Sequence, residues 1–556
     1  MKKKVVAILL LGAMLLSMLA ACGPKQNAET TPTPPVETQN TEPTKGPEET
    51  KKPEQSKAPE ETKKPEQSQA PEETKKPEES QDPEESQTPD TTPAPEESKT
   101  PDNTPAAAIT NRKAVNTNFT VPNGGYDGSK VTITFYNTMG SNLSAVLDQY
   151  IPEFNKLYPN ITVNYTSVGS YDDVRDQIAQ ELTVGNQPNI AYCYPDHVAL
   201  YNLARAVTQL DGLINSTETV THADGTTEYL GLTDDQIADF ITGYYNEGKQ
   251  FGDGLMYSMP MSKSTEVLYY NKTFFDANNI KVPTTWDEME QVCAKIKSID
   301  PNCIPLGYDS EANWFITMTE QYGSPYTSAT GNHFLFDNDQ NRAFVKKFNE
   351  WYNKGYLTTQ TIYGAYTSGL FVSTDKVKSY MSIGSSAGAT HQRPTKNADG
   401  TYPFEVGIAT IPQVNPSKPK VISQGPSLCI FQKSNPQEVI ASWLFVKFLT
   451  TNVEFQAEFS MASGYVPVLK SVGSNPVYAD FVKKANGGDY VAALAAKVCL
   501  AQESAYYTSP AFNGSSEARS QVGALMSKCI VLKGSNVDSQ IKAAFEDAID
   551  ECEYST

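Results

Sequence analysis

Hydrophobic and polar residues follow a strand, loop, strand pattern in residues 255–275, which read LMYSMPMSKSTEVLYYNKTFF. The apolar runs Leu255–Met259 and Glu266–Tyr270 flank the polar segment Ser262–Thr265, and Pro260 prevents one continuous helix. Hydroxyl side chains held between two buried strands can form hydrogen bonds with a small polar ligand. The pattern therefore predicts a crossing between two lobes, with a binding site at the crossing.

The segment before this crossing alternates between short runs of strand character and longer stretches with apolar positions at helical spacing. The predicted strands are Val131–Tyr136, Ile161–Thr166 and Asn189–Cys193; the predicted helices are Ser141–Leu157, Tyr171–Thr183 and one that begins at Val198–Ala204. This alternation predicts an α/β lobe with a mainly parallel sheet, which we expect to begin near Tyr126. In such sheets ligands bind beyond the carboxyl ends of the strands.

The segment after the crossing is again a mixture of strands and helices. Just before the crossing we expect a loop or hairpin over Ser216–Tyr229 and a helix over Asp234–Asn246. After it we expect helices at Thr285–Met289, Trp314–Tyr322 and Gln340–Lys354, and strands at Lys378–Ile383 and Phe404–Ala409. A further helix is predicted over Asn435–Leu449. The small residues Gly384–Ala389 form a turn where backbone can approach a ligand closely. Ile422–Leu428 is predicted to be a second lobe crossing. From Pro476 onward the chain is helical, with breaks at Gly487-Gly488 and Pro510.

The first 22 residues have the organisation of a secretion signal. Three lysines precede the apolar run Val5–Leu16, which is shorter than the roughly 20 residues of a membrane-spanning helix. The run is followed by Leu19-Ala20-Ala21-Cys22, which resembles the lipobox of bacterial lipoproteins. That resemblance implies that Cys22 is lipidated and becomes the mature N-terminus.

A low-complexity stalk follows over residues 23–115. From Pro24 to Ala108 it has no aromatic residue, and a 12-residue repeat begins at Pro47, Pro59 and Pro71. The same stretch holds 10 Lys against 17 Glu and 3 Asp, a net charge of −10 and half of the chain's −20. Such a segment cannot bury a core, so we expect it to be solvated and extended. It either carries the folded part through a thick cell wall or is a spacer of no required length.

The cysteines and the charge exclude several classes of protein. Seven cysteines remain after Cys22, without a C-x-x-C pair, so most are expected to be buried free thiols; a Cys293–Cys303 bridge stays open. The lone histidines His197 and His391 support no metal site. There is no G-x-S-x-G, phosphate-loop or H-E-x-x-H motif, and the acidic balance disfavours nucleic acid. We therefore expect neither an enzyme nor a cofactor.

Several strings from Val131 to Tyr554 together resemble the extracellular solute-binding proteins of ABC importers. These strings are SKSTEVLYYNKTFF (262–275), VPTTWDEM (282–289), YMSIGSSAGA (380–389), Ser423–Phe431 and ASGYVPV (462–468). The resemblance implies a two-lobe, periplasmic-binding-protein-like α/β fold of type II with hinge crossings. Lobe I would contain residues 126–255 and 421–470, and lobe II residues 260–415 and 471–556.

Within that family the chain looks most like the group that binds glycerol-3-phosphate and glycerophosphodiesters. The resemblance implies ligand contacts from Tyr171, Asp196, Ser264, Ser385 or Ser386, Gly425, Tyr465 and Arg519, although Asp196 is offset by one position. The group also places two tryptophans on one helix, where this chain keeps only Trp314. A guanidinium forms a planar fork that matches phosphate oxygens, which makes Arg519 the candidate for the ligand's charge.

The resemblance implies a lipid-anchored receptor on the outer face of a bacterial, Gram-positive cytoplasmic membrane. Its expected partners are a small polar solute, the importer's transmembrane subunits and the membrane through its anchor; we expect a monomer that binds no nucleic acid. The first ligand choice is glycerol-3-phosphate or a glycerophosphodiester, and the alternative is an oligosaccharide. A surface-anchored glycan hydrolase and a sensor or adhesion module are the rival classes.

Overall fold

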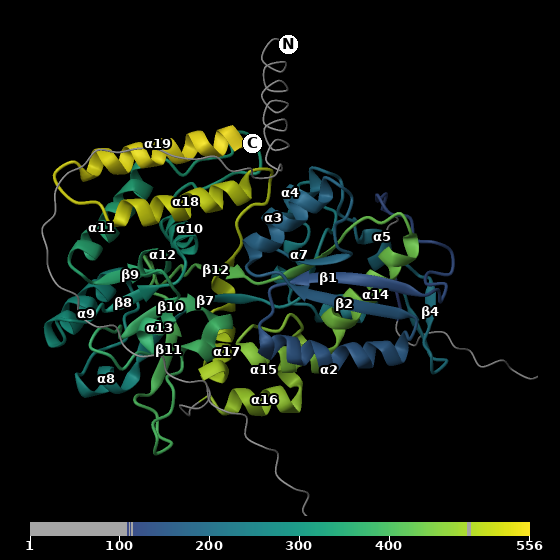
Figure 1. The fold of residues 1–556 in the computed structure, drawn as a ribbon, viewed down its shortest axis with the longest axis horizontal. Helices are drawn as coiled ribbons and strands as arrows, with labels where there is room; N and C mark the ends of the chain where they lie inside the picture. The colour runs from purple at the N-terminus through teal and green to yellow at the C-terminus, as the bar shows by residue number, and fades with distance from the viewer. Residues whose placement is uncertain (1–107, 111, 113–114, 486–490, 556) are drawn as a thin grey trace, which may run out of the picture. The chain divides into compact units, whose positions relative to one another are not determined.

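The structure is a computed structural model that describes residues 108–110, 112, 115–485 and 491–555. The chain divides into residues 1–96 and 97–556, and the described residues all belong to the second unit. The predicted signal peptide, Cys22 and nearly all of the stalk lie outside the described residues. The described part contains two main β-sheets with helices packed around each (Figure 1).

The first sheet contains the three strands predicted before the crossing. In spatial order its strands are β2 (Ile161–Ser167), β1 (Val131–Asn137), β3 (Ile190–Cys193), β13 (Ser427–Ile430) and β6 (Met259–Pro260). β2, β1 and β3 are parallel, as predicted, whereas β13 runs antiparallel to both β3 and β6. The helices of this part are α2 (Ser141–Leu157), α3 (Tyr171–Leu182), α4 (Pro195–Asn202), α14 (Pro436–Thr451) and α15 (Val453–Ser463).

The second sheet is mixed and has seven strands. In spatial order they are β14 (Tyr506–Tyr507), β12 (Val421–Gln424), β7 (Ser264–Asn271), β10 (Met381–Ser385), β8 (Leu306–Tyr308) and β9 (Leu357–Thr359), with β11 (Val406–Thr410) also paired to β7. Its helices are α8 (Lys272–Ala277), α9 (Trp286–Ile299), α10 (Glu311–Tyr322), α11 (Asp339–Asn353), α12 (Gln360–Tyr363), α13 (Ser368–Phe371), α18 (Ser515–Ile530) and α19 (Val537–Ser555). Figure 1 shows α18 and α19 side by side above this sheet.

Shorter elements complete the described part of the chain. They are α5 (Asp211–Ile214), the hairpin of β4 (Thr219–Thr221) and β5 (Thr227–Tyr229), α6 (Asp234–Asp239), α7 (Thr242–Glu247), the 3₁₀ segments η1 (Ser386–Gln392), η2 (Lys470–Ser474) and η3 (Glu503–Ala505), α16 (Pro476–Lys483) and α17 (Val491–Ala501). The hairpin falls in the predicted insertion. α17 packs against α15, a helix of the first part, and against β11 and β7 of the second sheet.

Both predicted crossings connect the two sheets. The chain leaves β6 in the first sheet and enters β7 in the second within residues 260–264, and it returns between β12 and β13 within residues 424–427. The prediction of a strand over Leu255–Met259 is wrong for most of its length, because only Met259–Pro260 pairs in the sheet. The backbone of Met256 and Tyr257 instead bonds to Leu210, the Asp211 side chain and Gly248.

The single helix predicted over Asp234–Asn246 is two short helices. Phe240 and Ile241 have extended backbone angles between α6 and α7. Phe240 forms a β-bridge with Leu469, and the Ile241 N–H donates to the Val468 carbonyl at 2.9 Å. Pairing with a segment more than 200 residues away therefore breaks the predicted helix in two. The local pattern of apolar residues carries no information about that segment.

The folded part begins before Tyr126, contrary to the sequence-based boundary. The Arg112 guanidinium pairs with Asp234 at 2.8 Å, and the Asn118 amide donates to the Val207 carbonyl at 2.8 Å. These polar contacts hold a segment that has few apolar residues, so hydrophobic periodicity could not indicate it.

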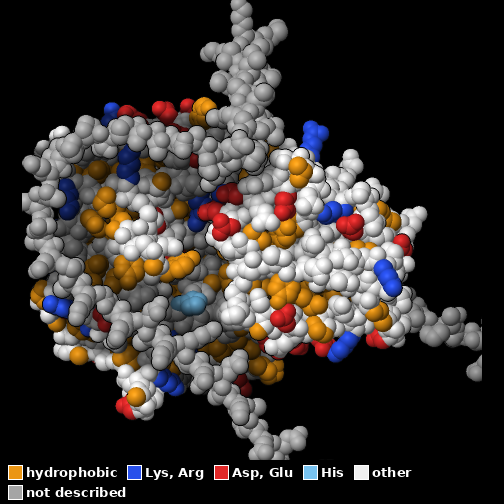
Figure 2. All heavy atoms as spheres, viewed as in Figure 1, with side chains coloured by type: hydrophobic (Ala, Val, Ile, Leu, Met, Phe, Trp, Pro, Cys, Tyr) orange, Lys and Arg blue, Asp and Glu red, His pale blue; other side chains and the backbone are white. Residues whose placement is uncertain are grey.

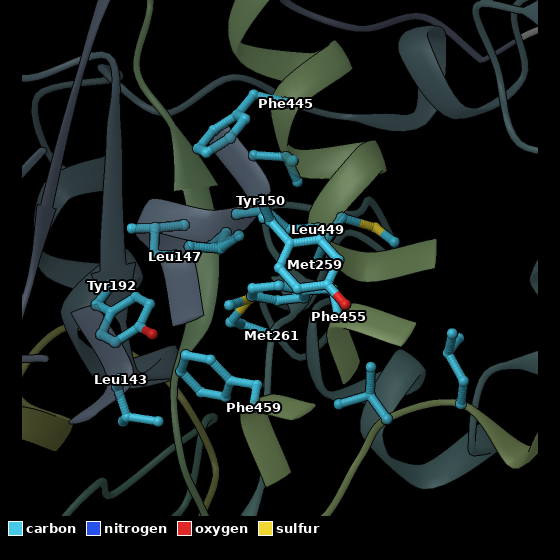
Figure 3. Packing of buried hydrophobic residues seen from close by; sticks show 14 of the residues in the cluster. Leu143, Leu147, Tyr150, Tyr192, Met259, Met261, Phe445, Leu449, Phe455 and Phe459 are labelled. Atoms are coloured by element: carbon cyan, nitrogen blue, oxygen red, sulfur yellow. The ribbon is translucent and has the colours of Figure 1, made fainter. Parts of the chain in front are cut away.

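A hydrophobic core holds the helices against the first sheet (Figure 3). Leu143 and Leu147 of α2 face Phe459 of α15, with Met261 of the first crossing among them. All seven cysteines in the described residues are buried free thiols, so the Cys293–Cys303 bridge is not formed. Burial raises the pKa of the Cys303 thiol to about 11, as expected for an inert core cysteine.

Replacing Gly425 with alanine is expected to lower the free energy of unfolding by more than about 1 kcal/mol. Gly425 lies between β12 and β13 with φ at +105°, and an added Cβ would lie 2.6 Å from the Ser262 carbonyl oxygen and 2.7 Å from the Lys263 Cα. Urea denaturation measures the loss. Gly473→Ala is the control, because no described atom lies within 4 Å of its added Cβ and its φ is not positive. Equal midpoints for the two variants would contradict the prediction.

Candidate functional site

A cleft of about 1240 Å³ lies between the two sheets and contains most of the predicted ligand residues. Its wall is formed by α3, the β3–α4 junction and Tyr465, two residues after α15, on one side, and by β7, β10, the start of α10 and α18 on the other. Because β3 ends at Cys193, the cleft lies beyond the carboxyl end of the parallel strands, as expected for an α/β lobe.

Three tyrosines form the first side of the cleft. The Tyr171 and Tyr465 hydroxyls lie 3.2 Å apart, and the Tyr171 ring stacks on Tyr194 with centroids 4.3 Å apart. Burial raises the pKa of Tyr171 and Tyr465, so both hydroxyls stay protonated at neutral pH. Tyr194 was missed by the sequence analysis. Its position directly after a strand and before Pro195, the first residue of α4, could have indicated that it lies in the cleft.

Arg519 reaches the cleft from α18 and contacts only neutral groups. Its Nη2 donates to the Asn313 Oδ1. With the Gln424 amide oriented so that its oxygen faces the guanidinium, Gln424 accepts from Nη1 at 3.2 Å and from Nη2 at 2.7 Å. No carboxylate of the described residues lies within ion-pair distance of Arg519. The second cleft arginine differs, since Arg175 pairs with Asp172 at 2.8 Å and Asp176 at 2.7 Å.

Carboxylates outnumber guanidiniums in the cleft wall. The lining carboxylates are Asp172, Asp196, Glu266, Asp309 and Glu311, against Arg175 and Arg519. Two of them are held by neutral donors: Asp309 accepts from the Thr367 hydroxyl at 2.7 Å, and Glu311 accepts from the Thr361 N–H at 2.9 Å. Glu266 was also missed by the sequence analysis, because its place in an apolar strand pattern gave no sign that it faces the cleft.

Ser264 and Ser385 line the cleft, and Gly425 lies next to it. Ser264 begins β7 and pairs with Gln424 of β12, so its side chain is placed by both crossing strands. Ser385 ends β10, where its Oγ accepts from the Ala387 N–H at 3.2 Å. Gly425 lines a smaller cavity of about 60 Å³, which shares Asp196 and Arg519 with the cleft.

Trp314 and Ser386 do not line the cleft. Because α10 begins at Glu311, Asn313 faces the cleft and Trp314 turns into the core, where it is 0% exposed and stacks on Tyr308 with centroids 4.6 Å apart. Ser386 is also fully buried, and its Oγ accepts from the Thr265 N–H at 3.2 Å. The tertiary structure thus gives both side chains structural partners away from the cleft.

The cleft histidines do not form a metal site with their neighbours. His197 and His391 both line the wall, and burial lowers the pKa of His197, so its ring is neutral near pH 7. Among the described residues, no group of three or more His, Cys, Asp or Glu side chains is arranged to hold a metal ion. None of the described helices has the length and apolar character needed to cross a membrane.

Comparisons with known proteins agree with this architecture. The model of the bacterial extracellular solute-binding protein family matches residues 149–486. The sn-glycerol-3-phosphate-binding periplasmic protein UgpB of Escherichia coli (strain K12) is 23% identical over 370 residues, which cover 64% of this chain and 79% of that protein.

Solved structures show the same fold. UgpB from Mycobacterium tuberculosis, in complex with glycerophosphocholine, matches with a TM-score of 0.61 at 18% identity, covering 75% of this chain and 98% of that one. The substrate-binding protein Lmo0181 from Listeria monocytogenes, in complex with cycloalternan, matches with a TM-score of 0.59 at 16% identity over 77% of this chain and 99% of that one. These likenesses confirm the predicted two-lobe, periplasmic-binding-protein-like α/β fold.

Proposed function

Because the chain belongs to the family of bacterial extracellular solute-binding proteins, and is thus the solute-binding component of an ABC importer and not an enzyme, we propose that its cleft captures a glycerophosphodiester. The observation that carries this proposal is Arg519, a cleft guanidinium without a carboxylate partner among the described residues. A guanidinium offers paired N–H donors in the geometry of phosphate oxygens, and here that charge is free for a ligand.

The charge of the cleft favours a diester over glycerol-3-phosphate. Five carboxylates and two arginines line the wall, so a dianionic monoester would meet net repulsion. A phosphodiester carries one negative charge, and a glycerophosphodiester with a cationic head group has no net charge. Its phosphate would face Arg519 and its cation would face the stacked Tyr171 and Tyr194, whose ring faces attract cations.

An oligosaccharide is the second candidate ligand. The cleft volume of about 1240 Å³ exceeds the roughly 300–1,000 Å³ of most small-molecule sites, and it leaves room for several sugar rings. Tyrosine faces and carboxylates suit the apolar faces and hydroxyls of sugars. The Listeria protein of the same fold was solved in complex with cycloalternan.

Capture would proceed by closure of the two sides of the cleft on the solute. Ligand contacts from both sides stabilise the closed arrangement, because only there are all of them made. In this structure Arg175 Nη1 of α3 donates to the Ser516 Oγ of α18 at 3.0 Å, which joins the two sides directly.

The folded part would be tethered outside the cell. A lipid on Cys22 would anchor the chain to the cytoplasmic membrane, and the stalk would let the cleft reach the importer's transmembrane subunits. We propose that the protein acts there as a monomer in a Gram-positive envelope. Mass spectrometry of the mature protein should detect a diacylglyceryl group on Cys22, and an unmodified N-terminus would contradict the anchor.

A thermal-shift and calorimetry panel tests the ligand. Purified protein is titrated with glycerophosphocholine, glycerol-3-phosphate and maltotriose at pH 6.5. We expect glycerophosphocholine to raise Tm most, because it is the proposed ligand. A ligand at about 100 times its Kd adds about 2.7 kcal/mol of stability to the folded protein. Tight binding of maltotriose without a response to either phosphate ester would replace the phosphodiester proposal with the oligosaccharide one.

A further inference from the structure

Glu266 is a buried carboxyl in the cleft wall that none of the contacts above explains. It lies on β7, two residues after Ser264, and is only 2% exposed. It lines the same cleft as Arg519 and Asn313. Burying a carboxyl costs free energy unless its oxygens find partners.

Only one of the two Glu266 oxygens has a partner. Oε2 accepts a hydrogen bond from the Tyr308 hydroxyl at 2.7 Å. Oε1 is buried and has no hydrogen-bond partner among the described residues. Because the Tyr308 hydroxyl occupies Oε2, a proton taken up by Glu266 would sit on Oε1. The side chain would then present an O–H donor.

The surroundings of Glu266 favour its neutral form. Burial raises its pKa from the usual 4.5 to about 7, and the Tyr308 hydrogen bond, the nearby Asn313 amide and the charge of Arg519 only partly oppose this. The titratable groups that face it are Tyr308 at the end of β8, Asp309 directly after it, Tyr507 of β14 and Arg519 of α18. Of these, Arg519 through its charge and Tyr308 through its hydrogen bond favour the ionised carboxylate.

We propose that Glu266 is a specificity-determining residue that contacts the solute as a neutral acid, its Oε1–H donating to an anionic oxygen of the phosphodiester that Arg519 binds. This inference rests on the proposed function. A bound anion cancels the field of Arg519 at Glu266 and would repel an ionised carboxylate. Binding therefore transfers one proton from solvent to Glu266 whenever that residue is ionised in the free protein. The contact selects solutes that carry an anionic oxygen over solutes that carry none.

The pH dependence of glycerophosphocholine binding tests the contact. A phosphodiester does not titrate between pH 6.0 and 8.5, unlike a phosphate monoester, so a change in affinity reports on the protein. We expect the wild-type Kd to rise on the order of 10- to 30-fold from pH 6.0 to 8.5, as the fraction with neutral Glu266 falls. Calorimetry in buffers of different ionisation enthalpy should detect proton uptake at pH 8.

The isosteric variant Glu266→Gln separates a solute contact from a structural carboxyl. Its amide N–H₂ donates at every pH, so we expect wild-type affinity at pH 6.0 and no Glu266-linked weakening at pH 8.5. Any pH dependence that both proteins share comes from groups other than Glu266. Glu153→Gln, which removes an exposed charge from α2, should behave as the wild type. The inference is overturned if Glu266→Gln keeps the full pH dependence of the wild type, or if it weakens binding at pH 6.0 by more than 10-fold.

The Tm measured without ligand distinguishes a failure of the Glu266 inference from a failure of the proposed ligand. A folded-state pKa above the usual 4.5 means that the unfolded chain ionises first as the pH rises. Glu266 therefore lowers stability progressively from pH 4.5 to about 7 and by a constant amount above that. The Tm of Glu266→Gln should exceed that of the wild type at pH 8.5 but not at pH 4.5. An equal Tm difference at both pH values overturns the inference alone, whereas wild-type protein that ignores glycerophosphocholine overturns the proposed ligand and this contact together.

Discussion

Replacing Lys263 with methionine is expected to destabilise the protein by about 3–5 kcal/mol, because it leaves a buried carboxylate without its partner. Lys263 is fully buried in the first crossing, and its Nζ donates to Glu247 Oε1 at 2.5 Å, to the Gly425 carbonyl at 3.2 Å and to the Ser427 Oγ at 3.1 Å. Its backbone also pairs with Val466. One residue thus joins the first crossing to the second through its side chain and to the segment after α15 through its backbone.

The double variant Lys263→Met, Glu247→Gln shows whether the loss of stability comes from the unpaired Glu247 carboxylate. With the carboxylate neutralised we expect about half or more of the stability to return, and the cycle of four proteins measures the coupling between the two side chains. Lys156→Met is the matched control, since Lys156 and Glu153 form an exposed pair that contributes about 0–1 kcal/mol. Chemical denaturation of all five proteins gives the comparison. A loss of less than 1 kcal/mol in Lys263→Met would show that the buried pair does not hold the crossings together.

Replacing Arg519 with alanine is expected to weaken binding of glycerophosphocholine about 100-fold or more, or about 3 kcal/mol, without unfolding the protein. In the proposed complex, the variant would remove two charge-assisted hydrogen bonds to phosphate oxygens. It also leaves Asn313 and Gln424, which are neutral and border the cleft, so water can replace the lost contacts. Calorimetry measures Kd, and Tm reports on folding.

Two further variants make the Arg519 result specific. Arg519→Lys keeps the charge but loses the planar fork, so an intermediate affinity is expected. Arg342→Ala removes an arginine of α11 that pairs with Asp337 and Asp339 and does not line the cleft, and its affinity should equal that of the wild type. Unchanged affinity in Arg519→Ala, with a normal Tm, would exclude Arg519 as the phosphate contact and favour a sugar ligand.

Local signals in the sequence were sufficient for most of the fold. The apolar spacing of Ser141–Leu157 predicted α2 with its observed ends. Thr285, where the sequence predicted the start of a helix, forms a capping box with Glu288 at the start of α9. The crossings at residues 260–264 and 424–427 lie within the predicted crossing segments, 255–275 and Ile422–Leu428. These features depend on residues within a few positions of one another, so the sequence contains their cause.

Only some of the residues that line the cleft were predicted. Tyr171, Asp196, Ser264, Ser385, Tyr465 and Arg519 line the cleft, and all were identified through the family resemblance. Whether they contact a solute is a separate question, which the binding experiments address. Trp314 was placed in the cleft by the same resemblance, but its neighbours along α10 turn it into the core against Tyr308.

The sequence by itself determined the α/β order and the two crossings, because periodicity, caps and turns act over short stretches of chain; Arg519 was identified through the family resemblance. The tertiary structure alone decided that Lys263 is a buried hinge contact and not a ligand contact, since its partner Glu247 and the second crossing are brought to it only by folding. It also decided that Glu266 faces the cleft with one free oxygen. Burial and missing partners are properties of packing between distant segments, and no local pattern in the chain records them.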